Sequence, residues 1–449
     1  MNKEDSKKYL NQKFQEFIFN LNQPYLKGGV QSAYTNVSIL DREHLKGFFE
    51  DKYYPNGELI LNYEDEIIEF QNSFLDYVGN LRKEKWHTFP VISASLVYKD
   101  GEYKDEETAK MVVNHNWKFG FNDVNIMRVD EVTSAASCCR LTSNTKEIGE
   151  GDTFNSIGGS DLNIGSSKVV DHNLVRLAIL SDNEEDFYHR VRENTKLIHK
   201  YHYCHRKILK KLIDKGLLPM YSSGMMDLNR QFATVGIGGV YEAVKVQGGI
   251  KEDNQGVYYS DKGYEIAENM FKVIKEENEQ TYDKYGFKAN IEQSPNESAA
   301  VKLNKKDRMM FGNRKINKLL SRDCYIYGNQ WIPLKENTNI FRRVEAAKLD
   351  EHCGGGAILH LNLGENFNSF EDAWKFEKEL ARKGVKYSSL ISLIDICKED
   401  HSFFGDTCPI CGSESVSKGI KIVGYLVKQN SYKEERKQEL NEREFYDLN

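Results

Sequence analysis

The chain has 449 residues and a formal net charge of -6, and its 39% hydrophobic and 12% aromatic residues are enough for a sizeable core. This length predicts one large barrel or two to three domains. The acidic balance does not indicate a nucleic-acid-binding surface, no apolar run approaches the roughly 20 residues of a membrane span, and the charged first residues predict no signal peptide.

Two helices are predicted near the start of the chain. Residues 3–22 place Phe14, Ile18 and Leu21 at helical spacing, and residues 62–82 show a second helical pattern. Farther along, strands alternate with helices across residues 130–385, and this alternation favours an α/β barrel.

A pair of adjacent cysteines, Cys138 and Cys139, precedes Arg140. Adjacent cysteines rarely form a disulfide or bind one zinc ion, because their side chains diverge. Considered alone, they are best interpreted as two packed thiols at a strand end, since free cysteine is among the most buried residue types. The chain has eight cysteines and no predicted secretion signal, which favours metal ligands, redox centres or buried thiols in a reducing, cytoplasmic compartment.

A long, charged helix is predicted over residues 185–215. It carries His199, His202 and His205 in a row that can suggest metal binding, but no cysteine or carboxylate pattern completes a site, so a solvated helix face is the favoured interpretation. The next segment, residues 232–242, predicts a strand, a glycine-rich turn and a helix. That turn is either a tight barrel turn or a cradle for phosphate, although it lacks the lysine of a P-loop.

The strongest chemical signal lies near the C-terminus. Cys408 and Cys411 form a Cys-x-x-Cys pair that is followed by Gly412, a residue suited to a tight knuckle. Cys397 and His401 lie upstream at a spacing that completes a set of four nitrogen and sulfur ligands. These ligands predict a tetrahedral zinc site. A zinc ribbon that only holds the C-terminal tail is the commoner kind of site.

The knuckle is followed at short range by Val423-Gly424-Tyr425-Leu426 and a charged tail. This arrangement resembles the C-terminus of the anaerobic (class III) ribonucleotide reductases, which are glycyl radical enzymes. The resemblance covers nearly the whole chain, and further blocks follow in the family's order. They are residues 28–37, 88–91, 232–242, 295–300, 327–334 and 354–365.

The resemblance implies an α/β fold, namely a glycyl radical enzyme-type α/β barrel that is incomplete at its N-terminal side, with a C-terminal zinc knuckle and glycyl radical loop. The predicted division is a catalytic barrel region over residues 1–388, the knuckle over residues 389–416, and the radical loop with the tail over residues 417–449.

The resemblance also implies roles for single residues. Gly424 matches the glycine that carries the family's stable radical, and glycine suits this role because its α-carbon, without a side chain, can become planar. Cys139 matches the cysteine that becomes a transient thiyl radical, with Cys138 as the alternative. Asn173 matches the asparagine that hydrogen-bonds the substrate ribose, although its segment, residues 164–176, departs from the family pattern at two positions.

The implied activity is the anaerobic reduction of ribonucleoside triphosphates to deoxyribonucleoside triphosphates for DNA synthesis. The implied cofactors are zinc and a glycyl radical installed by a radical-SAM activating enzyme. The implied partners are the ribonucleoside triphosphate, the activating enzyme and a second copy of the chain, with neither a membrane nor nucleic acid. The alternatives are a glycyl radical enzyme of the formate-lyase type, which the knuckle argues against, and a non-catalytic zinc-binding fragment of a split reductase.

The sequence departs from the family in two respects. Family members bring two Cys-x-x-Cys pairs to zinc, whereas Asp400 stands here where a second cysteine is expected. We favour the next residue, His401, as the fourth ligand and keep Asp400 as the alternative. The family also has a substantial segment ahead of the region matched by residues 10–40, which includes a second catalytic cysteine. The expectation is therefore a C-terminal portion that needs a separate N-terminal companion fragment.

Overall fold

The computed structural model describes residues 3–24, 32, 34–128, 132, 134–136, 142–144, 165–320, 324–422 and 425–447. The chain divides into two compact units. The first comprises Met1–Cys139, His360–Tyr432 and Phe445–Asn449, and the second comprises Arg140–Leu359 and Lys433–Glu444. The division at residues 388 and 416 that the sequence suggests stays a prediction.

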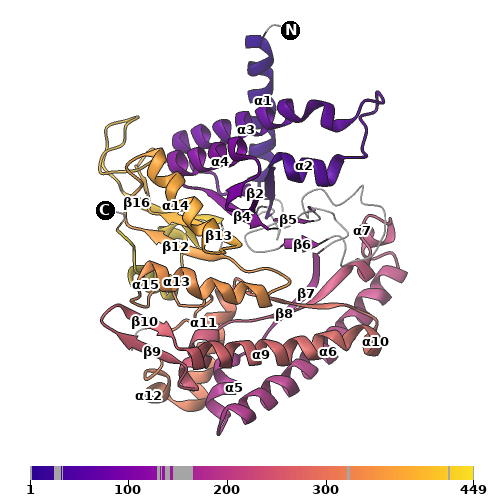
Figure 1. Ribbon diagram of the computed structural model, residues 1–449, viewed down its shortest axis with the longest axis vertical. Coiled ribbons are helices and arrows are strands. Elements are labelled where there is room, and N and C mark those ends of the chain that lie inside the picture. Colours follow the sequence, from indigo (N-terminus) through magenta and orange to yellow (C-terminus); the bar gives the residue numbers. More distant parts are fainter. Residues whose placement is uncertain are drawn as a thin grey trace. The chain divides into compact units, whose positions relative to one another are not determined.

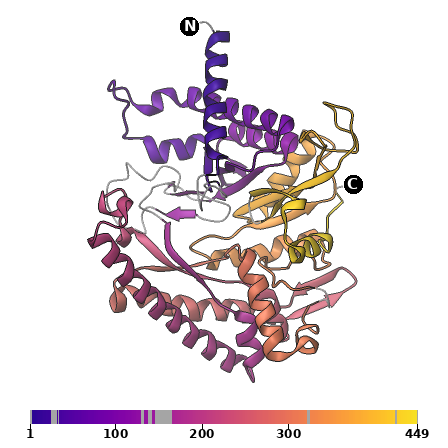
Figure 2. The same cartoon turned by 180° about the vertical axis from the view of Figure 1, so that it is seen from behind.

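The first unit joins the N-terminal third of the chain to the C-terminal segment (Figure 1). Figure 2 shows from behind how the purple ribbons lie beside the orange and yellow ribbons in this unit. Its elements are α1 (Lys3–Leu21), β1 (Asn36–Leu40), α2 (Arg42–Phe49), η1 (Ile60–Tyr63), α3 (Glu64–Glu84), β2 (Val91–Lys99), β3 (Glu102–Tyr103), α4 (Glu106–Phe119), β4 (Asn122–Met127), β5 (Ser134–Ala136), β12 (Leu359–Leu363), α14 (Phe370–Arg382), β13 (Tyr387–Ser392), β14 (Ile394–Ile396), β15 (Ser402–Phe403), β16 (Ser417–Ile422), β17 (Tyr425–Lys428) and η7 (Gln429–Ser431).

The main sheet of the first unit has the strand order β1-β2-β4-β13-β12, with β3 beside β2. β1, β2 and β4 are parallel, and β13 runs antiparallel to β4. β2 is buried along almost its whole length, as expected for a central strand covered on both faces. Ile92 of β2, Leu75 and Val78 of α3, and Ile18 of the predicted first helix share one core. The two helices predicted near the start of the chain are thus confirmed as α1 and α3.

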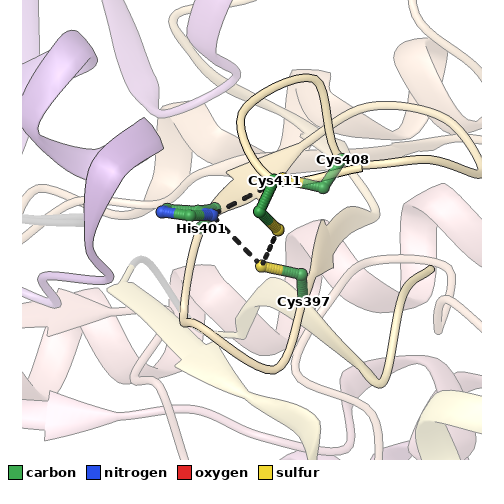
Figure 3. A group of neighbouring side chains, drawn as sticks. All are labelled: Cys397, His401, Cys408 and Cys411. Carbon is green, nitrogen blue, oxygen red and sulfur yellow. Dashed lines mark hydrogen bonds between the residues drawn. The ribbon is translucent and has the colours of Figure 1, made fainter. Parts of the chain in front are cut away.

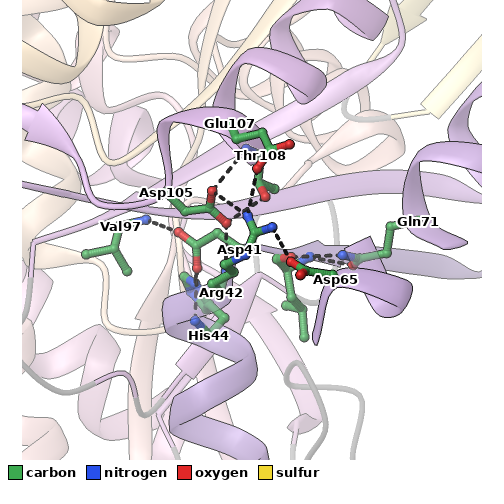
Figure 4. Close-up of polar contacts among 10 residues, drawn as sticks. Asp41, Arg42, His44, Asp65, Gln71, Val97, Asp105, Glu107 and Thr108 are labelled. Atoms are coloured by element: carbon green, nitrogen blue, oxygen red, sulfur yellow. Dashed lines mark hydrogen bonds and ion pairs between the residues drawn. The ribbon is translucent and has the colours of Figure 1, made fainter. Parts of the chain in front are cut away.

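A buried polar cluster joins β1, α2 and β2 (Figure 4). Asp41 is the N-cap of α2, and its carboxylate accepts hydrogen bonds from the backbone N–H of His44 (2.9 Å), from His44 Nδ1 (2.6 Å) and from the backbone N–H of Val97 (2.6 Å). The next residue, Arg42, donates to Asp105, the N-cap of α4, at 3.0 Å. One short segment therefore fixes the starts of two helices against the sheet.

The second unit contains the long helix that the sequence predicts. Its elements are β6 (Thr142–Asn144), β7 (Gly165–Asp171), α5 (Leu174–Leu180), α6 (Glu184–Asp214), α7 (Pro219–Ser222), η5 (Leu228–Arg230), β8 (Gln231–Gly236), α8 (Val240–Val246), β9 (Ile250–Asp253), β10 (Gly256–Tyr259), α9 (Asp261–Glu279), α10 (Thr281–Tyr285), β11 (Ala289–Glu292), α11 (Glu297–Phe311), α12 (Asn313–Ile316), α13 (Ile340–Ala346), η6 (Ala347–His352) and α15 (Glu434–Asn441).

A parallel sheet with the order β11-β8-β7 forms the centre of the second unit. α6 and α9 pack beside it, and their apolar faces share a core that includes Phe187, Val191, Met270 and Ile274. α6 begins at the N-cap Asn183, whose side chain accepts from the backbone N–H of a first-turn residue, and that turn is acidic. Among the described residues, no helix has the length and apolar character needed to cross a membrane.

The structure corrects the interpretation of the histidine row on α6. His199 and His202 are only 2% and 0% exposed, so a solvated face is the wrong description of this part of the helix. Burial lowers the pKa of each to about 4, which keeps both imidazoles neutral near pH 7. They do not belong to a metal-ligand group among the residues that the structure describes.

The glycine-rich turn between β8 and α8 is filled by protein. A Cβ atom placed on Gly238 would meet the side chain of Asn296, and one placed on Gly239 would meet Val175. Gly239 has φ +71°, and its N–H donates to the carbonyl of Gly328 at 2.8 Å. The contacts therefore favour the tight turn over the phosphate cradle.

Candidate functional site

The metal-ligand cluster is built on two short turns of the first unit. β14 and β15 pair antiparallel through Ile396 and Ser402, so the connection between them brings Cys397 and His401 to one end of the hairpin. The backbone N–H of Cys397 donates to the carbonyl of His401 at 3.1 Å, which closes this turn. Asp400 within it has φ +67°.

The second turn is the Cys-x-x-Cys knuckle. The N–H of Gly412 donates to the carbonyl of Cys408, and the N–H of Cys408 donates to the carbonyl of Ser413, both at 2.9 Å. Gly412 has φ +71°, the left-handed conformation that favours glycine and that the sequence led us to expect. A hydrogen bond from the Ser413 hydroxyl lowers the pKa of the Cys411 thiol to about 6, which favours the thiolate that a metal requires.

The four predicted ligands come together (Figure 3). Their ligand atoms all lie within 4.8 Å of one another. Nδ1 of His401 is 3.4 Å from Sγ of Cys397 and 3.6 Å from Sγ of Cys408, and Sγ of Cys411 is 3.6 Å from Sγ of Cys397. The Zn–S and Zn–N bond lengths of tetrahedral sites give edges of about 3.8 Å between two sulfurs and about 3.6 Å between sulfur and nitrogen. The donor set and its spacing fit a zinc ion.

Asp400, the alternative ligand, is engaged elsewhere. Its carboxylate forms an ion pair with Lys428 of β17, with Nζ and Oδ1 2.6 Å apart. The cluster contains His401 in its place. The pair ties the first metal-binding turn to the strand that follows Gly424 in the sequence.

The hairpin of β16 and β17 is attached to the main sheet by a buried ion pair. Residues 423–424 connect its two strands, so Gly424 belongs to that connection. Lys421 of β16 is 3% exposed in its side chain and contacts Asp123 of β4, which is fully buried, with Nζ and Oδ1 2.6 Å apart. The same ammonium lies 3.4 Å from the hydroxyl of Ser389 in β13. Burial raises the pKa of Asp123, and the charge of Lys421 limits that rise.

Apolar contacts hold the same hairpin. A Cβ atom on Gly419 of β16 would lie 2.1 Å from the indole of Trp86, so only glycine permits this approach. Tyr425, directly after Gly424, packs edge-on against Tyr34 with ring centroids 5.3 Å apart and stacks on Phe89 at 6.2 Å. The strands on both sides of residues 423–424 are therefore fixed by charge and by packing.

Three of the predicted catalytic residues, Cys138, Cys139 and Gly424, lie outside the described residues. Their roles stay predictions. Asn173 is described: it is the N-cap of α5, where its Oδ1 accepts from the N–H of Arg176 at 3.2 Å and its Nδ2 donates to Asp307 at 2.9 Å. These contacts orient the amide, and its predicted contact with a ribose is not tested by them.

Sequence reasoning missed the Lys421–Asp123 pair. The two residues are 298 positions apart, and neither stands in a motif. The sequence held only a weak signal for this pair. Lys421 stands between Ile420 and Ile422, and a charged residue inside a short apolar strand indicates a partner of opposite charge when the strand is buried.

Comparison with known proteins extends these observations. The family model described as anaerobic ribonucleoside-triphosphate reductase matches residues 1–446. A solved structure of an anaerobic ribonucleotide reductase is 38% identical, has a TM-score of 0.88, and aligns with 100% of this chain and 69% of its own. The Thermotoga maritima anaerobic ribonucleotide reductase with glycerol in its active site is 39% identical, with a TM-score of 0.86, and aligns over 98% of this chain and 70% of its own.

A curated relative from Haemophilus influenzae, an anaerobic ribonucleoside-triphosphate reductase, is 22% identical over 289 residues. That alignment covers 58% of this chain and 39% of the relative, so the matched part is well under half of the relative's length.

The solved neighbours place the fold in the class of anaerobic ribonucleotide reductases, which confirms the predicted fold class. Within that class, the chain belongs to the anaerobic ribonucleoside-triphosphate reductase family, whose model matches it almost from end to end.

Proposed function

We propose that this chain reduces ribonucleoside triphosphates to deoxyribonucleoside triphosphates by anaerobic radical chemistry. Membership of the family over residues 1–446 is the observation that carries the proposal. The fixed hairpin around residues 423–424, next to a four-residue metal cluster, supports it. The formate-lyase alternative is not favoured, because the family model and the solved neighbours are reductases.

The chemistry is a relay of hydrogen atoms. The radical on Gly424 takes a hydrogen atom from the thiol of Cys139, and the resulting thiyl radical removes the hydrogen atom from the 3′ carbon of the ribose. This step allows the 2′-hydroxyl to leave as water. Formate or a dithiol supplies the two electrons that reduction requires, and Cys139 then returns its hydrogen atom to the 3′ carbon. The thiyl radical that this leaves takes a hydrogen atom from Gly424, which restores both the thiol and the glycyl radical. Such a relay works only when the reacting groups are held close together.

The partners in this proposal are the ribonucleoside triphosphate, a radical-SAM activating enzyme that installs the radical, and a second copy of the chain. One solved relative, from Thermotoga maritima, is described in complex with dATP and CTP. That likeness supports a nucleotide substrate here. The N-terminal companion fragment suggested by the sequence stays a prediction.

A zinc ion held by Cys397, His401, Cys408 and Cys411 is the structural cofactor in this proposal. Its chemistry would be to cross-link two turns through thiolate and imidazole ligands. Pro409 and Ile410 lie between two of these ligands, so the ion would also fix the knuckle. The Asp400–Lys428 pair then connects the fixed turn to β17.

We expect about one zinc ion per chain by elemental analysis. Cys408→Ser combined with Cys411→Ser removes two of the four ligands, so the zinc content should fall to background. Cys204→Ser, an exposed cysteine of α6, is the matched control and should keep its zinc. Full zinc content in the double variant would rule out this ligand set.

The relay is tested by replacing the two adjacent cysteines one at a time. Cys139→Ser should still form the glycyl radical after anaerobic activation, because the radical is installed before the thiol is used. It should make no deoxynucleotide, because serine's O–H bond is too strong to replace S–H in the relay. Cys138→Ser should retain activity. Loss of turnover in Cys138→Ser with turnover kept in Cys139→Ser would move the role to Cys138.

A further inference from the structure

A cavity of about 270 Å³ lies within the first unit, beside the metal-binding knuckle. Helices α3 and α4, strand β15 and the hairpin residue Leu426 contribute to its walls, and Pro409 and Ile410 of the knuckle line it as well. Its aromatic wall consists of Trp86, Phe119, Phe121, Phe403 and Phe404. A space of this size and lining suits a small, flat, apolar group.

The charges around the cavity are all of one sign. Arg82, Lys83 and Lys118 line it, and among the described residues of its wall none carries a carboxylate. The ammonium of Lys83 lies 4.7 Å from the centre of the Phe119 ring. The cavity is therefore positive as well as aromatic, a combination that attracts organic anions.

Arg82 is the buried cation of this site and is 5% exposed. Its Nε donates to the carbonyl of His87 at 3.1 Å, and its Nη2 donates to the carbonyls of Thr88 and Pro90 at 3.4 and 2.6 Å. Its guanidinium also lies 4.5 Å from the Phe121 ring centre. Nη1 has no hydrogen-bond partner among the described residues, and Arg82 makes no ion pair with them.

A buried guanidinium without a carboxylate is unusual, because burial penalises a charge that is not paired. Carbonyl oxygens provide hydrogen bonds but no countercharge. Burial accordingly lowers the pKa of Arg82 below its ordinary value. An anion in the cavity would supply the missing charge and a partner for Nη1, through a charge-assisted hydrogen bond.

We propose that this cavity binds a small organic anion with a flat apolar body and one acidic group. The apolar body packs among Trp86, Phe121 and Phe404, and the acidic group contacts Arg82, with Lys83 and Lys118 contributing to the attraction. The cavity suits a group smaller than a nucleoside triphosphate, and none of the residues proposed above for the substrate chemistry lines it. The proposal rests on the cavity and its charges and does not depend on the radical chemistry.

Occupation of the cavity would link three parts of the first unit. The ligand would touch Arg82 on α3, Ile410 of the knuckle and Leu426, two residues after Gly424. A bound anion is therefore expected to stabilise the position of the knuckle and of the hairpin relative to α3. Binding to the folded state alone raises stability by mass action.

The test uses 6-fluoro-2-naphthoate, a flat aromatic carboxylate, and follows its binding by ¹⁹F NMR with the full chain. The neutral 6-fluoro-2-naphthamide has the same shape without the charge. We expect the carboxylate to bind roughly tenfold more tightly than the amide, because only the carboxylate forms a charge-assisted contact with Arg82. It should also raise the thermal unfolding midpoint of the chain.

Two variants locate the site. Arg82→Met should weaken carboxylate binding by roughly tenfold or more. Because Arg82 also holds three backbone carbonyls, Lys83→Gln combined with Lys118→Gln is the second variant, which leaves the fold intact and should weaken binding by roughly threefold. Lys375→Gln with Lys383→Gln, two exposed lysines of the same unit, is the matched control and should bind normally. Equal affinity for carboxylate and amide, or unchanged binding in the Lys83/Lys118 variant, would overturn the proposal.

Discussion

Gly424→Ala is expected to abolish the glycyl radical completely. After anaerobic activation, the unmodified chain should show an EPR doublet, and exposure to oxygen should cut the backbone at Gly424. Alanine adds a Cβ atom, which hinders the planar arrangement that delocalises the unpaired electron and narrows the space for close approach of another backbone. The variant should therefore show neither the doublet nor the cleaved C-terminal piece on a denaturing gel.

Gly354→Ala is the matched control for this experiment. A Cβ atom at Gly354 meets no other atom within 4 Å, and its backbone is not left-handed, so the substitution should be tolerated. This control should keep the doublet and the cleavage. If Gly424→Ala gave the same doublet and the same fragment as the unmodified chain, the radical would have to reside on another residue.

Lys421→Met is expected to produce the largest loss of stability among single changes in the hairpin. It leaves the carboxylate of Asp123 buried without its cation, and breaking a buried pair in this way costs about 3–5 kcal/mol. The free energy of unfolding, measured by denaturant titration, should fall by that order. Lys421→Met combined with Asp123→Leu should recover most of the loss, because no charge is then left buried.

The loss should depend on pH. Without Lys421, burial dominates over the hydrogen bond from Ser389 and raises the pKa of Asp123 in the folded state above its unfolded value. A raised pKa means that stability is retained at pH values below the unfolded pKa and is lost as pH rises through the folded pKa. The deficit of Lys421→Met should accordingly be larger at neutral pH than at acidic pH.

Lys418→Met on the same strand is the control for Lys421→Met. Lys418 pairs with Asp395 at 2.8 Å, but its side chain is 46% exposed, so the pair should contribute about 1 kcal/mol or less. Equal losses in the two lysine variants would show that the buried pair has no special part in holding the hairpin.

The zinc ligands were predictable because metal binding restricts both residue type and local spacing. Cys397, His401, Cys408 and Cys411 lie within a short segment, and the turns that bring them together are made by that segment itself. The choice between Asp400 and His401 was harder, because both carry ligand atoms. The choice depends on Lys428 of β17, which forms an ion pair with Asp400. A local sequence pattern does not reveal that this lysine lies near the turn.

The histidine row on α6 shows what the helical periodicity of a sequence does not predict. A helical pattern identifies α6, but it does not say how many of the helix's faces are covered by other elements. His199 and His202 lie on a covered face, near Phe287 from the segment that precedes β11. The partner of Lys421 was hidden for a related reason: contacts between β4 and β16 arise only from the tertiary fold.

Because Trp86 lies so close to Gly419, the fluorescence of this tryptophan can report whether the hairpin of β16 and β17 is in place. The indole ring lies directly over the backbone of β16, and the chain has only four tryptophans. The fluorescence emission of Trp86 depends on whether the β16 backbone or water surrounds its indole ring. Fluorescence from a sealed anaerobic cuvette can thus follow detachment and return of the hairpin in real time, under conditions in which the radical survives. With the other three tryptophans replaced by phenylalanine, the chain would carry its own optical reporter beside the radical loop, without an attached dye.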